Sequence, residues 1–403
     1  MLKFEEALAR ILSAIPPPAT EIVALNRACG RILAERVASP IDLPPFDNSA
    51  MDGYAVQSKD VASANPAQPV RLRLSGRVAA GESFGDGVAP GTCVRLFTGS
   101  PLPRGADAVV MQEDTRTEPE EPQQVLILDT AKPGENVRPR GEDIKRGATL
   151  AEAGQLLTVG HICLLAASGR AEVRVGRQPV VGLLATGSEL REAGQQLGPG
   201  QIYESNRLGL AALLERIGCI PKVFPLVADE PEAIRAALET ALSECDAVLT
   251  SGGVSVGEMD FVKSAFEATG GELQFWRVAI KPGRPFVFGR CREKFLFGLP
   301  GNPVSALVTF VLLARPALLR WQGAVDVSPP RSPGVLAEPL ANPGARRHFM
   351  RVKLDREGKV FSAGLQASHA LSSLAAANGL VDVPPETRLA AGETVQVIRW
   401  DEG

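Results

Sequence analysis

The sequence predicts a multidomain α/β plus β protein, in which a central α/β domain with a mostly parallel sheet lies between β-rich parts. The chain has 403 residues, which is too many for one ordinary core. Buried-strand and helical patterns alternate from residue 178 to about residue 321, as they do around parallel sheets. Short alternating stretches separated by Gly and Pro turns occur on both sides of that region, and they predict β-rich modules.

The first segment is predicted to be helical. Apolar residues recur at helical spacing from Phe4 to Ile15, and the run Pro16–Pro18 ends that helix. A second helical piece is predicted near Leu25 to Glu35. The alternating stretches between Pro40 and Arg140 predict a β-rich module, and helical patterning resumes at Thr158 to Ala167. The β-rich module is therefore expected to be an insertion between helical segments.

The central region repeats a buried strand, a polar loop and a helix. Continuous apolar runs predict buried parallel strands at Val180–Leu184, Ala247–Leu249 and Phe295–Leu299. Asn302 suits a helix N-cap and Pro303 suits the first helical position. The remaining helices are expected at Asn206–Ile217, Pro231–Leu242 and Phe261–Ala268.

The C-terminal part returns to β structure. A Pro-rich linker runs from Val327 to Pro333, and strands are predicted at Phe349–Leu354 and Val395–Ile398. We expect a small β-domain or a barrel.

Composition excludes several classes of function. The formal net charge is −3, so nothing indicates binding to nucleic acid or to an acidic membrane. The six cysteines are scattered without a Cys-x-x-Cys pair, which predicts buried thiols in a reducing, cytoplasmic compartment. The N-terminal segment lacks a signal-peptide pattern, and the most apolar stretch, Val304 to Leu319, is interrupted by Arg315 and Pro316. We therefore expect no membrane association.

Polar loops that contain glycine follow all three buried strands. Because the carboxyl ends of parallel strands meet at one edge of a sheet, loops 186–190, 251–257 and 299–305 predict a ligand site there. Gly252 and Gly253 would let the backbone approach a ligand and present N–H groups to an anion. The loop has neither a Walker A sequence nor dinucleotide-fingerprint spacing. For each loop taken singly, a tight structural turn remains the alternative.

Charged residues near these loops indicate the kind of ligand. Lys281 and Arg284 lie in a Pro- and Gly-rich loop and favour a phosphate or oxyanion, with a solvated turn as the alternative. Glu189, Asp229 and Asp260 follow predicted strand ends. These carboxylates would repel an anion unless a hard divalent cation bridges them to it; helix caps are the alternative.

The β-rich module and the histidines give weaker indications of a functional site than the loops of the central region do. Segments 47–55, 95–103 and 140–144 are candidate site loops, although each by composition is more often a turn. His161, His348 and His369 show no zinc-ligand spacing, and no Gly-x-Ser-x-Gly elbow supports a hydrolase triad.

Taken together, these motifs resemble the molybdopterin molybdenumtransferase family, which includes the C-terminal enzymatic domain of gephyrin. The resemblance covers nearly the whole chain. The matching segments occur in family order, at residues 47–55, 98–99, 141–144, 186–190, 251–257, 281–283, 299–305, 368–369 and 377–380.

The resemblance implies four domains. These are an N-terminal helical and linker domain (1–45 and 141–176), an inserted β-rich domain (46–140), a molybdopterin-binding α/β domain (177–326) and a C-terminal β-barrel (327–403). It also implies a homodimer, in which the active site uses the central domain of one subunit and the β-domain of its partner.

The resemblance further implies the site residues. The catalytic residues would be Asp52, Thr98, Asp143 and Glu189, and Asp229 and Asp260 would hold Mg²⁺. The substrate-binding residues would be Ser251, Gly252, Gly253, Ser255, Lys281, Arg284, Pro300, Pro303 and Ser368. Two positions depart from the family pattern: Arg284, where Lys is also common, and Glu258, which is often Asp. Both keep their charge, so the chemistry is expected to be unaffected.

The implied reaction converts adenylylated molybdopterin and molybdate into molybdenum cofactor and AMP. The implied partners are these two substrates, a second copy of the chain, the molybdopterin adenylyltransferase and molybdoenzyme apoproteins. Two alternatives stay open. One is a gephyrin-like scaffold, which ranks low because the sequence does not show gephyrin's extra domain and long linker. The other is a paralogue that handles tungstate or stores the cofactor.

Overall fold

The computed structural model describes residues 1–253 and 261–400, and the chain divides into two compact units. Unit 1 comprises Met1–Glu35, Ala153–Thr158 and Val173–Gly403, and unit 2 comprises Arg36–Glu152 and Val159–Glu172. Ser255, Glu258 and Asp260 lie outside the described residues.

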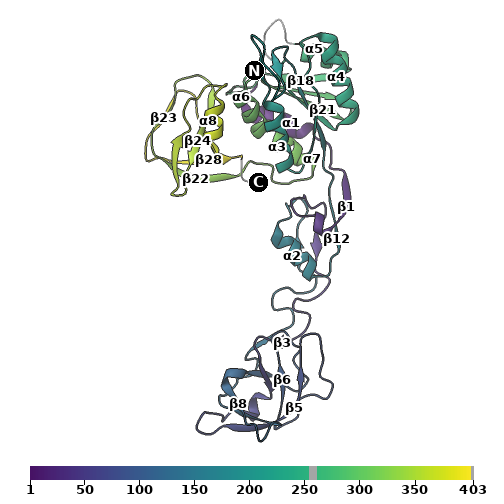
Figure 1. The fold of residues 1–403 in the computed structure, drawn as a ribbon, viewed down its shortest axis with the longest axis vertical. Coiled ribbons are helices and arrows are strands. Elements are labelled where there is room, and N and C mark those ends of the chain that lie inside the picture. The colour runs from purple at the N-terminus through teal and green to yellow at the C-terminus, as the bar shows by residue number, and fades with distance from the viewer. Residues whose placement is uncertain (254–260, 401–403) are drawn as a thin grey trace. The chain divides into compact units, whose positions relative to one another are not determined.

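The centre of unit 1 is a six-stranded sheet (Figure 1). Its first four strands run parallel, and the fifth is antiparallel to both of its neighbours, because the turn at Arg292–Glu293 is too short for a crossover. The predicted parallel core is therefore confirmed, and one antiparallel strand lies next to its edge strand. The order is β16 (Ile220–Val223), β13 (Val180–Ala185), β17 (Ala247–Ser251), β21 (Lys294–Leu299), β20 (Val287–Cys291) and β18 (Glu272–Trp276).

Helices cover both faces of this sheet. Alternate strand residues point to opposite cores, as Leu183 and Phe297 do to one and Leu184 and Leu296 to the other. The first core also receives α1 (Phe4–Ala14), α3 (Asn206–Arg216), α6 (Pro303–Thr309) and α7 (Arg315–Trp321). The second receives α4 (Pro231–Glu244) and α5 (Val262–Ala268).

A π-helical segment, Phe310–Ala314, joins α6 to α7. The combined helix Pro303–Trp321 is the one described helix that is long and apolar enough to cross a membrane by length and composition. Its most apolar window is 83% buried within the protein, as is common for a core helix.

The helix predicted near Leu25 to Glu35 is wrong. Only the short 3₁₀ turn Leu25–Arg27 forms, and Gly30 then adopts a φ of +79°. Ile32 and Leu33 form bridges to Leu156 and Val175. Long-range pairing therefore overrides the local helical pattern.

The C-terminal part of unit 1 is a closed five-stranded barrel, as predicted. The strands pair in the ring β24, β25, β22, β28, β26 and back to β24, so no edge is left open. The short strand β19 (Ile280–Lys281) pairs with β24, which links the central domain to the barrel. The bounds are β22 (Arg331–Leu336), β24 (Arg347–Leu354), β25 (Lys359–Ser362), β26 (Gly379–Val383) and β28 (Thr394–Arg399), with helix α8 (Leu371–Ala376).

Unit 2 contains the predicted β-rich domain. Its sheet has apolar clusters on two sides, and Gly53 is required because a Cβ there would lie 2.1 Å from the Val110 carbonyl oxygen. Helix α2 (Val159–Ala167) also belongs to this unit. The strand order is β7 (Ala108–Met111), β4 (Gly53–Val56), β6 (Thr92–Leu96), β5 (Val70–Val78), β9 (Gln124–Ile127) and β8 (Thr115–Thr117).

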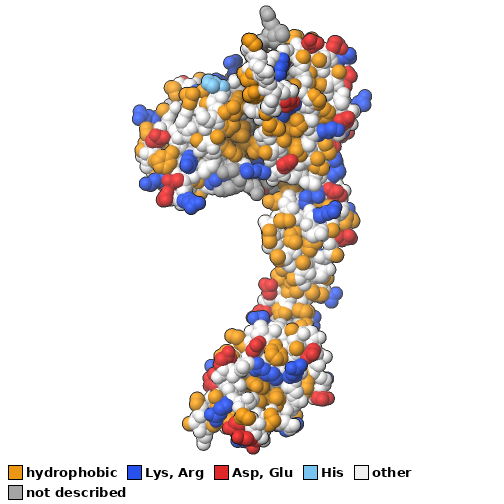
Figure 2. All heavy atoms as spheres, viewed as in Figure 1, with side chains coloured by type: hydrophobic (Ala, Val, Ile, Leu, Met, Phe, Trp, Pro, Cys, Tyr) orange, Lys and Arg blue, Asp and Glu red, His pale blue; other side chains and the backbone are white. Residues whose placement is uncertain are grey.

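Short two-stranded pairs complete the fold. They are β1 (Thr20–Ala24) with β12 (Glu172–Gly176), β2 (Val37–Ala38) with β11 (Thr149–Ala151), β3 (Asn48–Ser49) with β10 (Val137–Arg138), β14 (Leu190–Arg191) with β15 (Ile202–Tyr203), and β23 (Leu340–Asn342) with β27 (Thr387–Leu389). Figure 2 shows acidic and basic side chains interspersed on the visible face of each unit.

Candidate functional site

The predicted loops meet at the carboxyl edge of the central sheet. They surround an open cavity of about 670 Å³, which we call the acidic cleft. Residues from the ends of β13, β17 and β21 and from the start of α3 line it. The polar lining includes Thr186, Glu189, Glu204, Asp229, Ser251 and Asn302.

Gly252 and Gly253 keep the loop after β17 close to the loop after β13. A Cβ on Gly252 would lie 2.8 Å from the Thr186 carbonyl oxygen, and one on Gly253 would lie 2.9 Å from Thr186 Oγ1. The Gly252 N–H donates to the Leu299 carbonyl oxygen at 3.2 Å, so it serves loop packing and is not available to a ligand. The expectation that both glycine N–H groups face a ligand therefore does not hold for Gly252.

The cleft carries three carboxylates in different surroundings. Glu189 is exposed, whereas Asp229 is half-buried and exchanges hydrogen bonds with Ser188: Ser188 N–H donates to Asp229 Oδ2 at 3.4 Å, and Asp229 N–H donates to Ser188 Oγ at 3.3 Å. Glu204 is buried. No group of three or more His, Cys, Asp or Glu suited to a metal ion occurs among the described residues.

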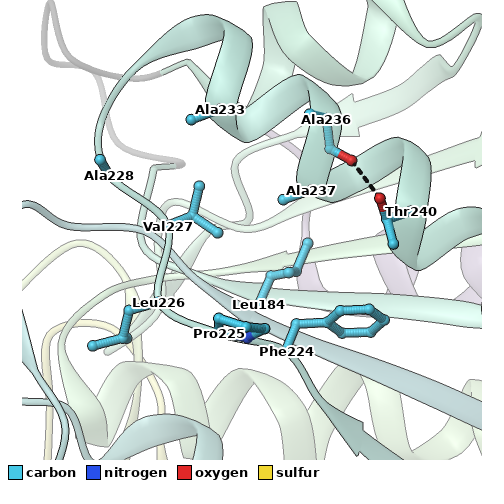
Figure 3. Close-up of a pocket in the computed structure, with 10 residues that line it drawn as sticks. All are labelled: Leu184, Phe224, Pro225, Leu226, Val227, Ala228, Ala233, Ala236, Ala237 and Thr240. Atoms are coloured by element: carbon cyan, nitrogen blue, oxygen red, sulfur yellow. Dashed lines mark hydrogen bonds between the residues drawn. The ribbon is translucent and has the colours of Figure 1, made fainter.

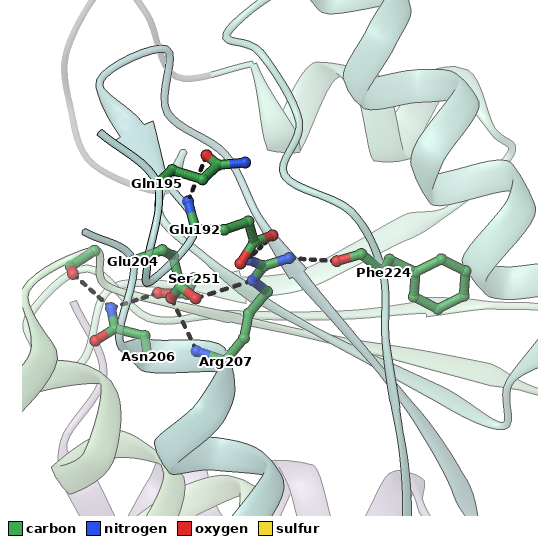
Figure 4. Close-up of polar contacts among 8 residues, drawn as sticks. Glu192, Gln195, Glu204, Asn206, Arg207, Phe224 and Ser251 are labelled. Atoms are coloured by element: carbon green, nitrogen blue, oxygen red, sulfur yellow. Dashed lines mark hydrogen bonds and ion pairs between the residues drawn. The ribbon is translucent and has the colours of Figure 1, made fainter. Parts of the chain in front are cut away.

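A buried ion pair joins Glu204, which lines the cleft, to Arg207 (Figure 4). Arg207 donates to Glu204 Oε2 at 3.0 Å, and both side chains are 3% exposed. The same guanidinium donates to Glu192 Oε1 at 2.8 Å and to the Phe224 carbonyl oxygen. Removing one member of such a pair leaves an unpaired buried charge, which is strongly destabilising. This network therefore stabilises the position of the chain between β14 and α3.

A second cavity of about 460 Å³, the basic pocket, lies where the central domain meets the barrel. Lys281, Arg284, Arg346 and Ser368 line it. Arg346 donates to the Ile280 carbonyl oxygen at 3.0 Å. Desolvation, and then the neighbouring charge of Arg284, lower the pKa of the Arg346 guanidinium, which nevertheless stays protonated.

The two cavities share one wall, formed by Pro285, Pro300, Asn302 and His369. Asn302 occupies the predicted N-cap of α6, but its side chain makes no capping hydrogen bond. Pro303 occupies the first turn, as predicted. The acidic cleft, with its carboxylates, and the basic pocket, with its cations, therefore lie side by side in unit 1.

In unit 2, the structure brings Asp52 and Thr98 together. The Thr98 N–H and hydroxyl each donate to Asp52 Oδ1 at 2.8 Å, and these bonds, the backbone one first, lower the pKa of the Asp52 carboxyl. The nearby Arg95 guanidinium lies over the rings of Tyr54 and Phe97. Asp143 is also exposed, in a separate turn of this unit.

A further cavity of about 380 Å³ has a different chemistry (Figure 3). Its lining includes Leu184, Phe224 and Val227, and no lining residue is charged. The one side-chain hydroxyl in it, that of Thr240, donates to the Ala236 carbonyl oxygen at 2.9 Å. This apolar cavity does not suit an anionic substrate.

Comparison with known proteins covers almost the whole chain. The family profiles that match are the MoeA N-terminal region (domain I and II) at residues 2–169, the probable molybdopterin binding domain at residues 182–320 and the MoeA C-terminal region (domain IV) at residues 333–400. The molybdopterin molybdenumtransferase of Haemophilus influenzae is 40% identical over 98% of both chains. The chain belongs to the molybdopterin molybdenumtransferase family.

Other members of the family are similar over the same length. The molybdopterin molybdenumtransferase of Bacillus subtilis is 35% identical over 98% of this chain and 93% of its own. The crystal structure of the molybdopterin biosynthesis MoeA protein from Pyrococcus horikoshii superimposes with a TM-score of 0.84, at 35% identity, over 100% of both chains. The fold class predicted from the sequence is thereby confirmed.

Sequence reasoning missed three residues of unit 1 that belong to the candidate site. Arg346 is brought to the basic pocket by the pairing of β19 with β24, and its only local signal is the basic pair that it forms with Arg347. Arg207 lay in a predicted helix without a recognised partner. Asn206 lines the acidic cleft and bonds two of its loops.

Proposed function

We propose that this chain inserts molybdate into adenylylated molybdopterin and releases AMP, forming molybdenum cofactor. The observation that carries the proposal is the shared wall between the acidic cleft and the basic pocket. The reaction cleaves the phosphoanhydride of adenylylated molybdopterin, releases AMP and transfers the metal of molybdate to the dithiolene. It therefore needs neighbouring sites for a phosphoanhydride and for an oxyanion.

The acidic cleft is proposed to hold the phosphoanhydride. Glu189 and Asp229 are hard oxygen donors, and Mg²⁺ binds one or two carboxylates together with substrate phosphates and waters, so the residues fit this ion. Bound Mg²⁺ would offset the pyrophosphate charge and polarise the phosphoanhydride as a Lewis acid. Asp229 and Asp260 are the two proposed protein ligands. The chain's own polar groups, Ser251 among them, orient the substrate oxygens.

The basic pocket is proposed to receive molybdate as substrate. Lys281, Arg284 and Arg346 supply three cations, and Ser368 supplies a hydroxyl. A dianion with four oxygens matches such a set, because charged donors bind oxyanions more strongly than neutral donors do. Binding there places molybdate next to the substrate in the cleft.

Asp52, Thr98, Asp143 and Glu189 are proposed as the catalytic residues. The hydrogen bonds from Thr98 lower the pKa of the Asp52 carboxyl, so they stabilise its carboxylate as an anion that can bind a cation or accept a hydrogen bond. The molybdopterin adenylyltransferase and molybdoenzyme apoproteins are proposed as partners in the cytoplasm.

We also propose that the chain acts as a homodimer. Helix α2 is strongly apolar, yet among its residues only Leu165 is buried, and Val159 is 69% exposed. An apolar helix that is left uncovered marks a protein interface, and a second copy of the chain is the partner that closed two-fold symmetry predicts.

The experiment is to incubate the purified protein with adenylylated molybdopterin, Mg²⁺ and either molybdate or tungstate, and to follow AMP release. We expect release to require Mg²⁺ and to be faster with molybdate. Lack of AMP release with either oxyanion would overturn the proposed reaction. Faster release with tungstate would assign tungstate as the preferred substrate and leave the proposed class of reaction unchanged.

A further inference from the structure

Asn206 joins two loops of the acidic cleft. It is the first residue of α3, and its amide nitrogen lies 2.7 Å from Ser251 Oγ and 2.7 Å from the Gly301 carbonyl oxygen (Figure 4). Ser251 ends β17 and Gly301 follows β21, so one side chain spans the ends of two adjacent strands.

The Gly301 carbonyl determines the orientation of this amide. A carbonyl oxygen only accepts hydrogen bonds, so the amide atom that faces it must be the nitrogen, Nδ2. The same nitrogen faces Ser251, and its two hydrogens serve the two contacts. Ser251 Oγ is therefore an acceptor in this contact.

The hydroxyl hydrogen of Ser251 is not used in this contact. Ser251 is 4% exposed and lines the cleft, and no acceptor for its hydrogen is found among the described residues. Because Asn206 donates a hydrogen bond to Ser251 Oγ, the hydroxyl hydrogen of Ser251 stays available to an acceptor in the cleft. We infer that Asn206 is a positioning residue that fixes Ser251 as a hydrogen-bond donor to an anionic oxygen of the substrate.

This inference rests on the proposed function, because it takes the ligand to be a phosphate-bearing nucleotide. The charged groups of the cleft are carboxylates, which only accept, and the Gly252 N–H is already used. A phosphate oxygen there needs neutral donors. Thr186 is a second candidate, since its hydroxyl is buried without a partner among the described residues and lies beside the same loop.

The test is a double-mutant cycle on affinity for AMP in the presence of Mg²⁺, measured by calorimetry with the full chain. We expect Asn206→Ala and Ser251→Ala each to weaken AMP binding about tenfold, and the double variant to be weakened about tenfold rather than a hundredfold. If the two residues act together, the losses of affinity are not additive in free energy. If they act independently, the two fold-losses multiply. Additive losses would overturn the inference.

A second variant keeps the size of the side chain and reverses its polarity toward Ser251. The donor to the Gly301 carbonyl oxygen is lost in both backgrounds compared below, so its loss cancels in the comparison. Asn206→Asp preserves the side-chain shape, and a negative charge is favourable at the start of a helix. The new carboxylate only accepts, so it draws the Ser251 hydrogen away from the ligand. We expect a loss of AMP affinity of at least about tenfold in the native chain and of about threefold, from charge alone, in the Ser251→Ala background. Equal losses in the two backgrounds would contradict the inference.

Asn378→Asp is the matched control. Asn378 also bonds backbone groups through its amide, but it lies in the barrel and lines neither cavity. It should lower thermal stability and leave AMP affinity within twofold, and a larger loss would show that the assay follows folding and would remove its support for the inference. If the unaltered chain does not bind AMP, the proposed function falls and the inference falls with it. If it binds AMP and the cycle is additive, only the inference falls.

Discussion

The acidic cleft and the basic pocket lie next to each other and share a wall, but they are built differently. The charged side chains of the cleft, such as Glu189 and Asp229, follow strand ends of one sheet. The cations of the pocket come from the end of β19, from the loop after it and from the residue before β24, and more than sixty residues of chain separate Arg346 from Lys281 and Arg284. One edge of a sheet therefore provides the first site, whereas the second exists only because a strand of the central domain pairs with the barrel.

The largest effect is expected from the basic pocket. Lys281→Ala removes one of its three cations, and we expect AMP release to fall at least about a hundredfold, as it does when a preorganised donor to developing charge is removed. Steady-state assays with saturating Mg²⁺ measure this. Lys353→Ala, an exposed lysine of the barrel that lines neither cavity, is the control and should keep full activity. Equal activity of the two variants would remove the pocket from the reaction.

Complementation tests whether Asp52 of unit 2 and Lys281 of unit 1 act in one active site that two subunits share. Asp52→Ala and Lys281→Ala chains should each be inactive. If the homodimer places the carboxylate of one subunit and the cation of the other in one active site, mixed and reassembled chains regain one intact site in each heterodimer. Statistical mixing then restores about a quarter of the activity. No recovery, with subunit exchange demonstrated by a tag, would show that both residues act within one subunit.

The acidic cleft depends on a buried ion pair, whereas none is found among the described residues that line the basic pocket. Arg207→Met leaves the buried Glu204 carboxylate without its partner, so we expect the free energy of unfolding to fall by about 3–5 kcal/mol. Urea unfolding of the purified chain measures this change. Arg216→Met, at an exposed position of the same helix, should change it by less than about 0.5 kcal/mol. A similar loss in both variants would mean that the ion pair has no special role.

A smaller effect is expected for the proposed metal ligands of the cleft. Asp229→Asn should raise the Mg²⁺ concentration needed for half-maximal AMP release about tenfold, because a carboxylate binds Mg²⁺ more strongly than an amide does. Glu230→Gln changes the adjacent, exposed acid, which lines neither cavity, and should leave this concentration unchanged. An unchanged Mg²⁺ requirement in Asp229→Asn would assign the metal to other residues.

The smallest effect concerns Asp52, which lies outside both cavities. Its pKa is lowered in the folded chain, so its ionised form stabilises the fold at pH values above the ordinary carboxyl pKa, and that contribution is lost as pH falls through the folded value. Asp52→Asn should lower Tm by about 1–2 °C near pH 7, and the difference should shrink progressively as the pH falls below the ordinary carboxyl pKa. Asp86→Asn, another exposed acid of unit 2, is the control. A difference that is independent of pH would contradict the assignment.

Local pattern determined most of the central domain. The apolar runs that became β13, β17 and β21 and the Gly loops after them were visible in the sequence, and the rule that parallel strand ends share an edge brought Glu189, Ser251 and Pro300 to one cleft. The expectation near Leu25 to Glu35 failed because backbone pairing to Leu156 and Val175 competed with a helical period.

By itself, the sequence determined the family, the order of the elements and the set of loops that carry the site, because periodicity and turn residues act over short stretches of chain. Only the tertiary structure decided that Arg346 joins Lys281, that Arg207 is buried against Glu204, and that Asn206 spans Ser251 and Gly301. These contacts depend on pairing and packing between distant segments. No local pattern specifies such pairings, because each side chain alone is equally compatible with exposure to solvent.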